Sequence, residues 1–153
     1  MADDAHRSVT LTRTGPSTFE ARNVRGGTMP VGSGGEDPDL FSPVELLLVG
    51  IAGCSGIDVD LLTSRLSEPE SFEISAAGDK VRDGDGNHMG PITVTVSVTF
   101  PAGEAGDAAR DRLPDAVAKS RDRLCTVSRT VQLPTAVTYE LAGPAGPGVP
   151  APA

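Results

Sequence analysis

The chain has 153 residues, which is enough for one domain with a substantial core but not for two. Only 3% of the residues are aromatic and tryptophan is absent, so valine, leucine, isoleucine and alanine must build that core. The formal net charge is −8, and an acidic surface gains nothing by contact with phosphates, which excludes nucleic acids and anionic membranes as expected partners.

Residues 1–7 are polar and are expected to be disordered. They carry acidic residues where a signal peptide has its basic region, and no apolar run follows them. We therefore expect a cytoplasmic protein, in which thiols are kept reduced and two cysteines do not form a disulfide scaffold.

Three short strands are predicted after this terminus. Residues 8–14 alternate between apolar and polar side chains, and a Gly-Pro turn separates them from a second strand at residues 17–23. A Gly-Gly turn then leads into a third strand at residues 28–32. Residues 33–40 form an acidic, glycine-rich loop before the next element.

Residues 42–66 are predicted to form a long helix around which the rest of the chain is organised. Ser42 suits the N-cap, Pro43 suits the first helical position, and Glu45 completes a capping box. The uncharged run at residues 46–57 is apolar on nearly every face and is too short to span a bilayer. It is therefore interpreted as a core helix surrounded by protein.

Glycine recurs at every third position of this helix, at Gly50, Gly53 and Gly56. A helical glycine costs about 1 kcal/mol relative to alanine. The stripe therefore predicts a neighbour that packs very close to it, such as a crossing helix. One of the two cysteines, Cys54, lies within the stripe.

The second half of the chain is predicted to contain a strand at 72–81, a turn at 83–87, a strand at 92–100, a helix at 104–124, a short helical turn from Cys125 and a last strand at 137–141. The resulting order, βββ-α-ββ-α-β, belongs to the α+β class, with the central helix packed on one face of an antiparallel sheet. The Ala/Gly/Pro tail at 143–153 is expected to be disordered, which leaves one domain at residues 8–142.

No metal or cofactor is expected. The turn at residues 83–87 begins like a calcium loop, but His88 occupies the position that needs glycine, so a hairpin turn is the better interpretation. His6 and His88 stand apart from other potential ligands and are interpreted as solvated side chains.

The two cysteines are the remaining candidates for chemistry, and the residues alone leave two interpretations open. Buried free cysteines often serve only as small apolar core residues. The apolar surroundings of Cys54, and Asp58 one helical turn later, would both raise its thiol pKa and oppose reactivity. Cys125 has a more favourable neighbourhood, although arginines beside a helix are often only a solvated face. The arginines in question are Arg121, Arg123 and Arg129.

Three segments carry a resemblance to a known family: SPVELLLVGIAGCSGIDVD from Ser42, HMGPITVTVSVTF from His88, and AVAKSRDRLCTVSRTVQLPTAVTYEL from Ala116. Together they resemble the OsmC/Ohr family from about Val9 to Leu141. The resemblance implies an OsmC-like fold and an intertwined homodimer, with the two central helices packed together and the active sites at the interface.

The same resemblance implies a function for the cysteine pair. Cys54 matches a peroxidatic cysteine, whose thiolate attacks an organic hydroperoxide and becomes a sulfenic acid. Cys125 matches a resolving cysteine, which condenses with that sulfenic acid to a disulfide. A dithiol reductant such as a lipoylated protein then restores both thiols. The implied activity is a thiol-dependent peroxidase for organic hydroperoxides, acting in defence against oxidative stress.

The sequence departs from the well-understood peroxidases of that family at one position. Those enzymes activate the cysteine with an arginine from the early strands, which is held by a glutamate ten residues before the cysteine. Val44 occupies this position here, and the neighbouring Glu45 has its role in the capping box. Arg22 is the arginine chosen as activator, with Arg13 and Arg25 as alternatives. The departure indicates the broader OsmC-like group rather than a true Ohr protein.

A second function belongs to a different class. The chain could be a non-enzymatic dimeric module that binds a small apolar or acyl ligand near Cys54. The cysteines would then be retained for packing or sensing. The pH dependence of thiol alkylation separates the two functions, because a reactive Cys54 requires a lowered pKa.

Overall fold

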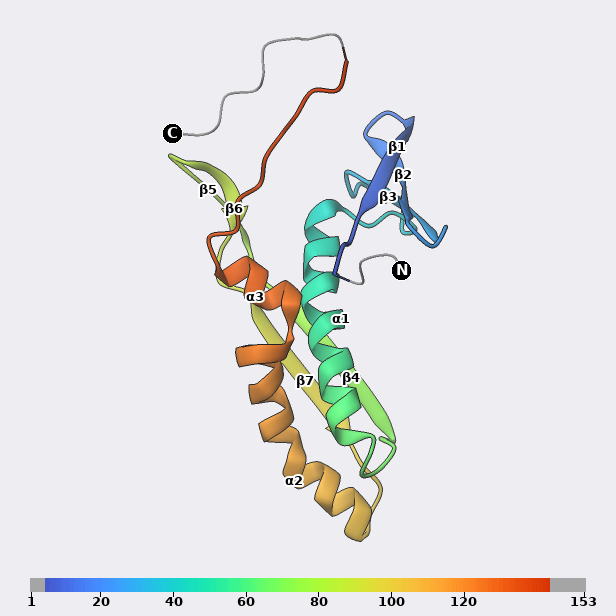
Figure 1. Cartoon of the computed structure of the whole chain (residues 1–153), viewed down its shortest axis with the longest axis vertical. Coiled ribbons are helices and arrows are strands. Elements are labelled where there is room, and N and C mark those ends of the chain that lie inside the picture. The colour runs from blue at the N-terminus through green and yellow to red at the C-terminus, as the bar shows by residue number, and fades with distance from the viewer. Residues whose placement is uncertain (1–4, 144–153) are drawn as a thin grey trace.

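The structure, a computed structural model, describes residues 5–143 and is a mixed α+β fold of helices and antiparallel strands (Figure 1). The disorder predicted for the two ends falls largely on residues 1–4 and 144–153, which lie outside the described range. The elements in chain order are β1 (Val9–Gly15), β2 (Thr18–Asn23), β3 (Thr28–Gly32), α1 (Pro43–Thr63), β4 (Ser71–Ala77), β5 (Lys80–Asp83), β6 (Gly86–Met89), β7 (Thr93–Thr99), α2 (Glu104–Lys119), the π-helical turn η1 (Ser120–Leu124) and α3 (Thr126–Gln132).

β1, β2 and β3 form an antiparallel sheet beside the N-terminal end of α1 (Figure 1), and each strand agrees with its prediction to within one residue. Because side chains alternate across a strand, the register places Leu11, Arg13 and Phe19 on one face. Glu20 and Arg22 lie on the opposite, polar face. The first face is partly uncovered, since Leu11 is 48% and Phe19 37% exposed, whereas Val31 on the same face is buried.

α1 begins with the predicted capping box. The Glu45 backbone N–H donates to Ser42 Oγ at 3.3 Å, and the Ser42 backbone N–H donates to Glu45 Oε2 at 2.7 Å. Pro43 occupies the first helical position, where its missing N–H costs nothing. These local contacts account for the helix start and give Glu45 a structural role at the cap.

One side of α1 is buried and the other is not. Ile51 and Val59 are buried against the rest of the chain, whereas Val49 is 50%, Ile57 64% and Leu61 52% exposed. By length and composition alone α1 is apolar enough to cross a membrane, a property that core helices of soluble proteins share. The described residues of one chain therefore cover only one side of this helix, and the cover predicted for its other side stays a prediction.

The glycine stripe has the close neighbour that was predicted, at Gly56. A Cβ at Gly56 would lie 3.2 Å from the Ile74 side chain of β4, so this glycine permits close packing of α1 on the strand. Gly50 faces Val127 at an ordinary 3.5 Å, and Gly53 faces open space. Within residues 5–143, a strand and not a crossing helix makes the tight contact with the stripe.

The region between the two long helices holds more strands than predicted. The single strand expected at 72–81 is split into β4 and β5, and the hairpin turn at 83–87 leads back through β6, which was not predicted. β4 and β7 pair in antiparallel fashion along their whole length and lie beside α1 (Figure 1). α2 and η1 together cover the predicted helix at 104–124, and α3 is the helical turn expected after Cys125.

The strand predicted at 137–141 is wrong. This segment has no assigned secondary structure, and its alternating apolar side chains are exposed: Val137 by 71%, Tyr139 by 73% and Leu141 by 66%. The local pattern is that of a strand, but a strand also needs a partner edge. No described part of the same chain supplies one.

Candidate functional site

The fold brings the two cysteines together. Cys54 is half-buried in the middle of α1, and Cys125 is fully buried at the N-cap of α3. The sulfur atoms of Cys54 and Cys125 and a carboxylate oxygen of Asp58 all lie within 4.8 Å of one another. Both thiols are free. The juxtaposition predicted for the pair, which lies far apart in the sequence, is present in the structure.

A π-helical turn places Cys125. After α2 the backbone hydrogen bonds of η1 join residues five positions apart. One of them runs from the Cys125 backbone N–H to the Ser120 carbonyl oxygen, at 3.0 Å. Such turns are rare and often occur at functional sites. Cys125 then leaves the helix with extended dihedrals and begins α3. The sharp change of direction points its side chain toward α1.

Two donors hold the Cys125 sulfur. The Ser128 backbone N–H donates to Cys125 Sγ at 3.3 Å, as expected for an N-cap side chain. From the neighbouring helix, the Ser55 hydroxyl donates to the same sulfur at 3.4 Å. Sequence reasoning missed both serines, although the three-residue spacing from Cys125 to Ser128 is the N-cap signal that could have found one of them.

Burial raises the pKa of the Cys54 thiol, as its apolar surroundings predicted, and this is the largest influence on it. The Val127 backbone N–H acts in the opposite direction, and a hydrogen bond with Cys125 raises the pKa further. Because the thiolate is the nucleophile, Cys54 within this single chain is held in its unreactive form at neutral pH. Activation requires a positive charge from elsewhere.

Asp58 is the third polar group beside the sulfurs. It lies one turn after Cys54 on α1, and the Ser120 hydroxyl donates to its Oδ2 at 2.9 Å. The carboxylate therefore connects α1 to η1 just before Cys125.

The structure does not bring the two other predicted residues to the pair. Arg22 forms an ion pair with Glu20 at 3.2 Å on the polar face of β2. Glu45 is occupied by Ser42 at the start of α1. Within residues 5–143, the groups that influence the Cys54 thiol are Cys125, Thr126 and Val127, and no arginine is among them.

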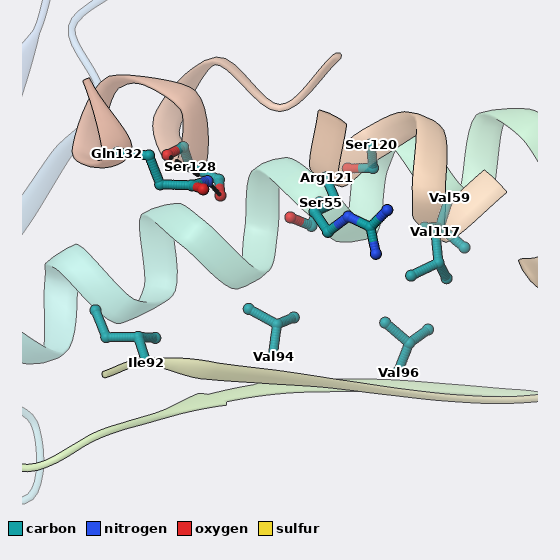
Figure 2. A pocket seen from close by; sticks show the side chains of 10 residues that line it. All are labelled: Ser55, Val59, Ile92, Val94, Val96, Val117, Ser120, Arg121, Ser128 and Gln132. Atoms are coloured by element: carbon teal, nitrogen blue, oxygen red, sulfur yellow. Dashed lines mark hydrogen bonds between the residues drawn. The ribbon is translucent and has the colours of Figure 1, made fainter. Parts of the chain in front are cut away.

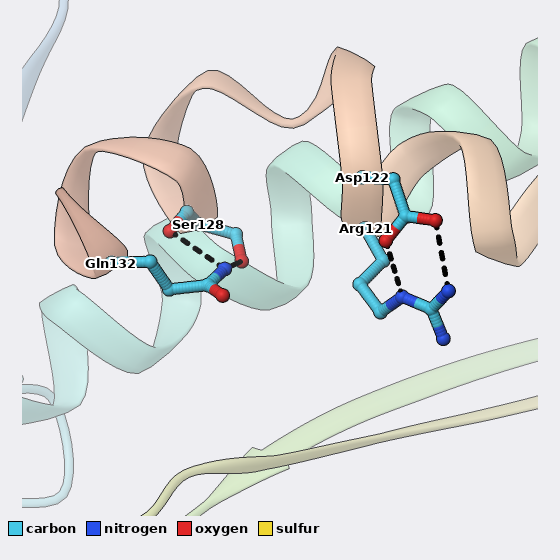
Figure 3. Close-up of polar contacts among 4 residues, drawn as sticks. All are labelled: Arg121, Asp122, Ser128 and Gln132. Carbon is cyan, nitrogen blue, oxygen red and sulfur yellow. Dashed lines mark hydrogen bonds and ion pairs between the residues drawn. The ribbon is translucent and has the colours of Figure 1, made fainter.

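Arg121, one of the arginines that flank Cys125 in the sequence, pairs with its neighbour Asp122. Arg121 donates two hydrogen bonds to the Asp122 carboxylate, at 2.6 and 2.8 Å (Figure 3). This pair is exposed, so it contributes little to stability. Ser128 and Gln132, drawn beside it, are joined by their own hydrogen bonds (Figure 3).

A cavity of about 390 Å³ lies between α1 and β7, beside the thiol pair (Figure 2). Ser55 and Ser128, the two donors to Cys125 Sγ, form part of its wall. Aliphatic side chains supply most of the remaining surface, and these are Val59, Ile92, Val94, Val96 and Val117. Ser120, Arg121 and Gln132 add polar groups to the lining, and neither cysteine is part of it (Figure 2). The volume and lining suit a small molecule with an apolar part and a polar end.

The family model for OsmC-like proteins matches residues 34–140. This chain belongs to the OsmC-like family. An uncharacterized protein of Mycobacterium tuberculosis is 31% identical to this OsmC-like protein over 131 residues, which are 84% of this chain and 91% of the relative.

Solved structures agree with the assignment. An OsmC-like protein of unknown function from Vibrio cholerae superposes with a TM-score of 0.68 at 11% identity, over 84% of this chain and 94% of that one. A Legionella pneumophila protein described as an organic hydroperoxide resistance protein superposes with a TM-score of 0.56 at 14% identity, over 82% and 89%. At these identities the likeness concerns the fold, and it confirms the OsmC-like architecture predicted for the chain.

Proposed function

We propose that this OsmC-like protein is a thiol-dependent peroxidase that reduces organic hydroperoxides through Cys54 and Cys125. The observation that supports it is the approach of the two sulfur atoms, within 4.8 Å of each other. The name of the Legionella protein, which shares the fold, points to the same chemistry. The aliphatic cavity beside the pair suits the organic part of such a substrate.

The proposed cycle uses three steps. The Cys54 thiolate attacks the terminal peroxide oxygen, the O–O bond breaks, and the departing alkoxide takes a proton to leave as an alcohol. Cys54 is now a sulfenic acid. The Cys125 sulfur attacks the oxidised sulfur, so that a disulfide forms and water leaves. A dithiol, for which a lipoylated protein is our proposed source, then reduces the disulfide by exchange.

We propose that a second copy of the chain completes the site. The exposed side of α1, the apolar face of the β1–β3 sheet and the unpaired segment at 137–141 are all at least partly uncovered in one chain. Apolar surface of this extent normally marks an interface. An intertwined homodimer, as the family resemblance implies, would cover all three surfaces.

The dimer also suggests a source for the missing cation. Arg13 lies on the apolar face of the sheet that a second copy would cover, whereas Arg22 lies on the opposite face with Glu20. We therefore propose Arg13 in place of Arg22 as the activating arginine. Its guanidinium would lower the thiol pKa that burial raises.

Turnover of an organic hydroperoxide by cysteine variants tests this function. With cumene hydroperoxide and a dithiol reductant, Cys54→Ser should abolish turnover because the nucleophile is gone. Cys125→Ser should allow one oxidation of Cys54 and then stall. Unchanged steady-state turnover in Cys54→Ser would refute the proposal.

The aliphatic cavity favours one alternative function, a non-enzymatic module that binds an apolar or acyl ligand near Cys54. Displacement of a fluorescent fatty acid measures such binding. Under this alternative the unaltered chain should bind the fatty acid and reduce no peroxide, and Val94→Trp, which fills the cavity, should abolish binding. If the unaltered chain reduces peroxide and Val94→Trp loses both binding and turnover, the cavity belongs to the peroxidase.

A further inference from the structure

The cluster of Cys54, Asp58 and Cys125 has the composition of a metal site. Its two sulfur atoms and one carboxylate oxygen lie within 4.8 Å of one another. Cys54 and Asp58 come from successive turns of α1, and Cys125 comes from the start of α3, so two rigid elements hold the three donors. Sequence reasoning expected no metal site, because it considered only the histidines and the turn at 83–87.

We propose that the reduced protein binds one Zn²⁺ ion between Cys54, Asp58 and Cys125. Two thiolates and one carboxylate are ligands that zinc accepts, whereas magnesium and calcium require oxygen donors throughout. Three protein ligands leave a fourth tetrahedral position for water.

The distances allow such an ion with small side-chain movements. Zinc–sulfur bonds of about 2.3 Å place two tetrahedral thiolates about 3.8 Å apart. The donor atoms here are separated by no more than 4.8 Å. A contraction of about 1 Å is within reach of the χ angles of cysteine and aspartate.

A second layer of hydrogen bonds already orients the donors. Ser120 donates to the Asp58 carboxylate at 2.9 Å, and Ser55 and the Ser128 backbone N–H donate to the Cys125 sulfur at 3.4 and 3.3 Å. Each of these groups donates a hydrogen bond to a ligand atom, which favours the anionic form of that atom. This is the arrangement that outer-shell residues adopt around metal ligands, where their loss lowers metal affinity about 10- to 100-fold.

Metal binding changes no oxidation state. The ion displaces the two thiol protons to solvent, and its +2 charge offsets the three negative charges of the deprotonated ligands. If the proposed peroxidase function holds, zinc and hydroperoxide compete for the same sulfur atoms, so zinc would protect the thiols and inhibit turnover. The binding itself does not depend on that function.

Cobalt and zinc titrations of the reduced, full-length protein test the site. Co²⁺ should bind once per chain and give the thiolate charge-transfer and tetrahedral absorption bands, which Zn²⁺ then removes. Cys54→Ser and Cys125→Ser should each weaken zinc binding at least 100-fold, and Asp58→Asn should weaken it at least 10-fold. Ser120→Ala, which removes only the hydrogen bond to Asp58, should weaken it about 10-fold.

Asp60→Asn is the matched control, because Asp60 is an exposed carboxylate on the same helix, away from the thiols. Its zinc affinity should equal that of the unaltered chain. Absence of tight binding to the reduced protein would overturn the proposal, as would an Asp58→Asn affinity equal to that of Asp60→Asn. Peroxide turnover without zinc binding would refute the zinc site and leave the proposed peroxidase function intact. Zinc binding without peroxide turnover would refute the peroxidase function and leave the zinc site intact.

Discussion

At the scale of single residues, the central question is how Cys54 becomes reactive. Burial and the hydrogen bond with Cys125 raise its pKa, and only the backbone N–H groups of Val127 and Thr126 act against them. A protomer alone therefore contains a cysteine pair in the right place for disulfide formation but without the charge that makes the first thiol a nucleophile.

The pH dependence of Cys54 alkylation measures this activation, preferably in Cys125→Ser so that one thiol is observed. A raised pKa means that the thiolate appears only at higher pH, so for a protomer the midpoint should lie above the ordinary thiol value of 9.0. If a second copy supplies Arg13, the midpoint in the assembled protein should fall below that value, and Arg13→Gln should raise it again. Arg22→Gln is the matched control and should leave it unchanged. Equal midpoints in the two arginine variants would contradict the role proposed for Arg13.

At the scale of elements, Glu45 at the start of α1 has two candidate roles, one in the capping box and one in the site, and a substitution can distinguish them. Its hydrogen bonds with Ser42 hold the pKa of the carboxyl below its ordinary value. A lowered carboxyl pKa stabilises the fold at pH values above the unfolded-state pKa, and this contribution is lost as the pH falls through the folded-state value. Glutamine also completes a capping box, but it cannot form an ion pair with an arginine.

Glu45→Gln should therefore keep both stability and peroxide turnover, whereas Ser42→Ala should lower the free energy of unfolding by about 1 kcal/mol. Urea denaturation at neutral pH measures the two free energies. A large loss of turnover in Glu45→Gln, with unchanged stability, would give Glu45 a role in the site beyond the cap.

The elements also show what local sequence determines. The capping box, the three N-terminal strands and the helical turn after Cys125 each depend on neighbouring residues, and all were predicted correctly. The segment at 137–141 and the exposed side of α1 depend on what lies opposite them, which a local pattern does not contain. The approach of Asp58 to both sulfurs likewise depends on η1, a change of hydrogen bonding that no propensity scale predicts.

At the scale of the whole molecule, the chain leaves many large apolar side chains exposed. The exposed side of α1 and the apolar face of the β1–β3 sheet account for several of them. The first surface lies on α1, the helix that contains Cys54, and the second lies on the sheet beside the N-terminal end of α1 (Figure 1). We therefore propose that formation of the dimer is also the step that activates Cys54.

Ile57→Glu tests the assembly, because Ile57 is 64% exposed on α1 and a buried charge in its place would oppose an interface. Sedimentation velocity should show a dimer for the unaltered chain and a folded monomer for this variant, with far-UV circular dichroism as the measure of folding. Val81→Glu, an exposed apolar position in the β5–β6 hairpin, is the control and should remain dimeric. A monomeric unaltered chain at micromolar concentration would contradict the dimer.

The most direct test of the cysteine pair is the mass of the reduced protein after one equivalent of an organic hydroperoxide, followed by non-reducing peptide mapping. We expect a loss of two hydrogen atoms and a single peptide pair joined through Cys54 and Cys125. In Cys125→Ser we expect the gain of one oxygen on Cys54. Stepwise addition of oxygen to the unaltered protein without a Cys54–Cys125 link would contradict the proposed peroxidase cycle.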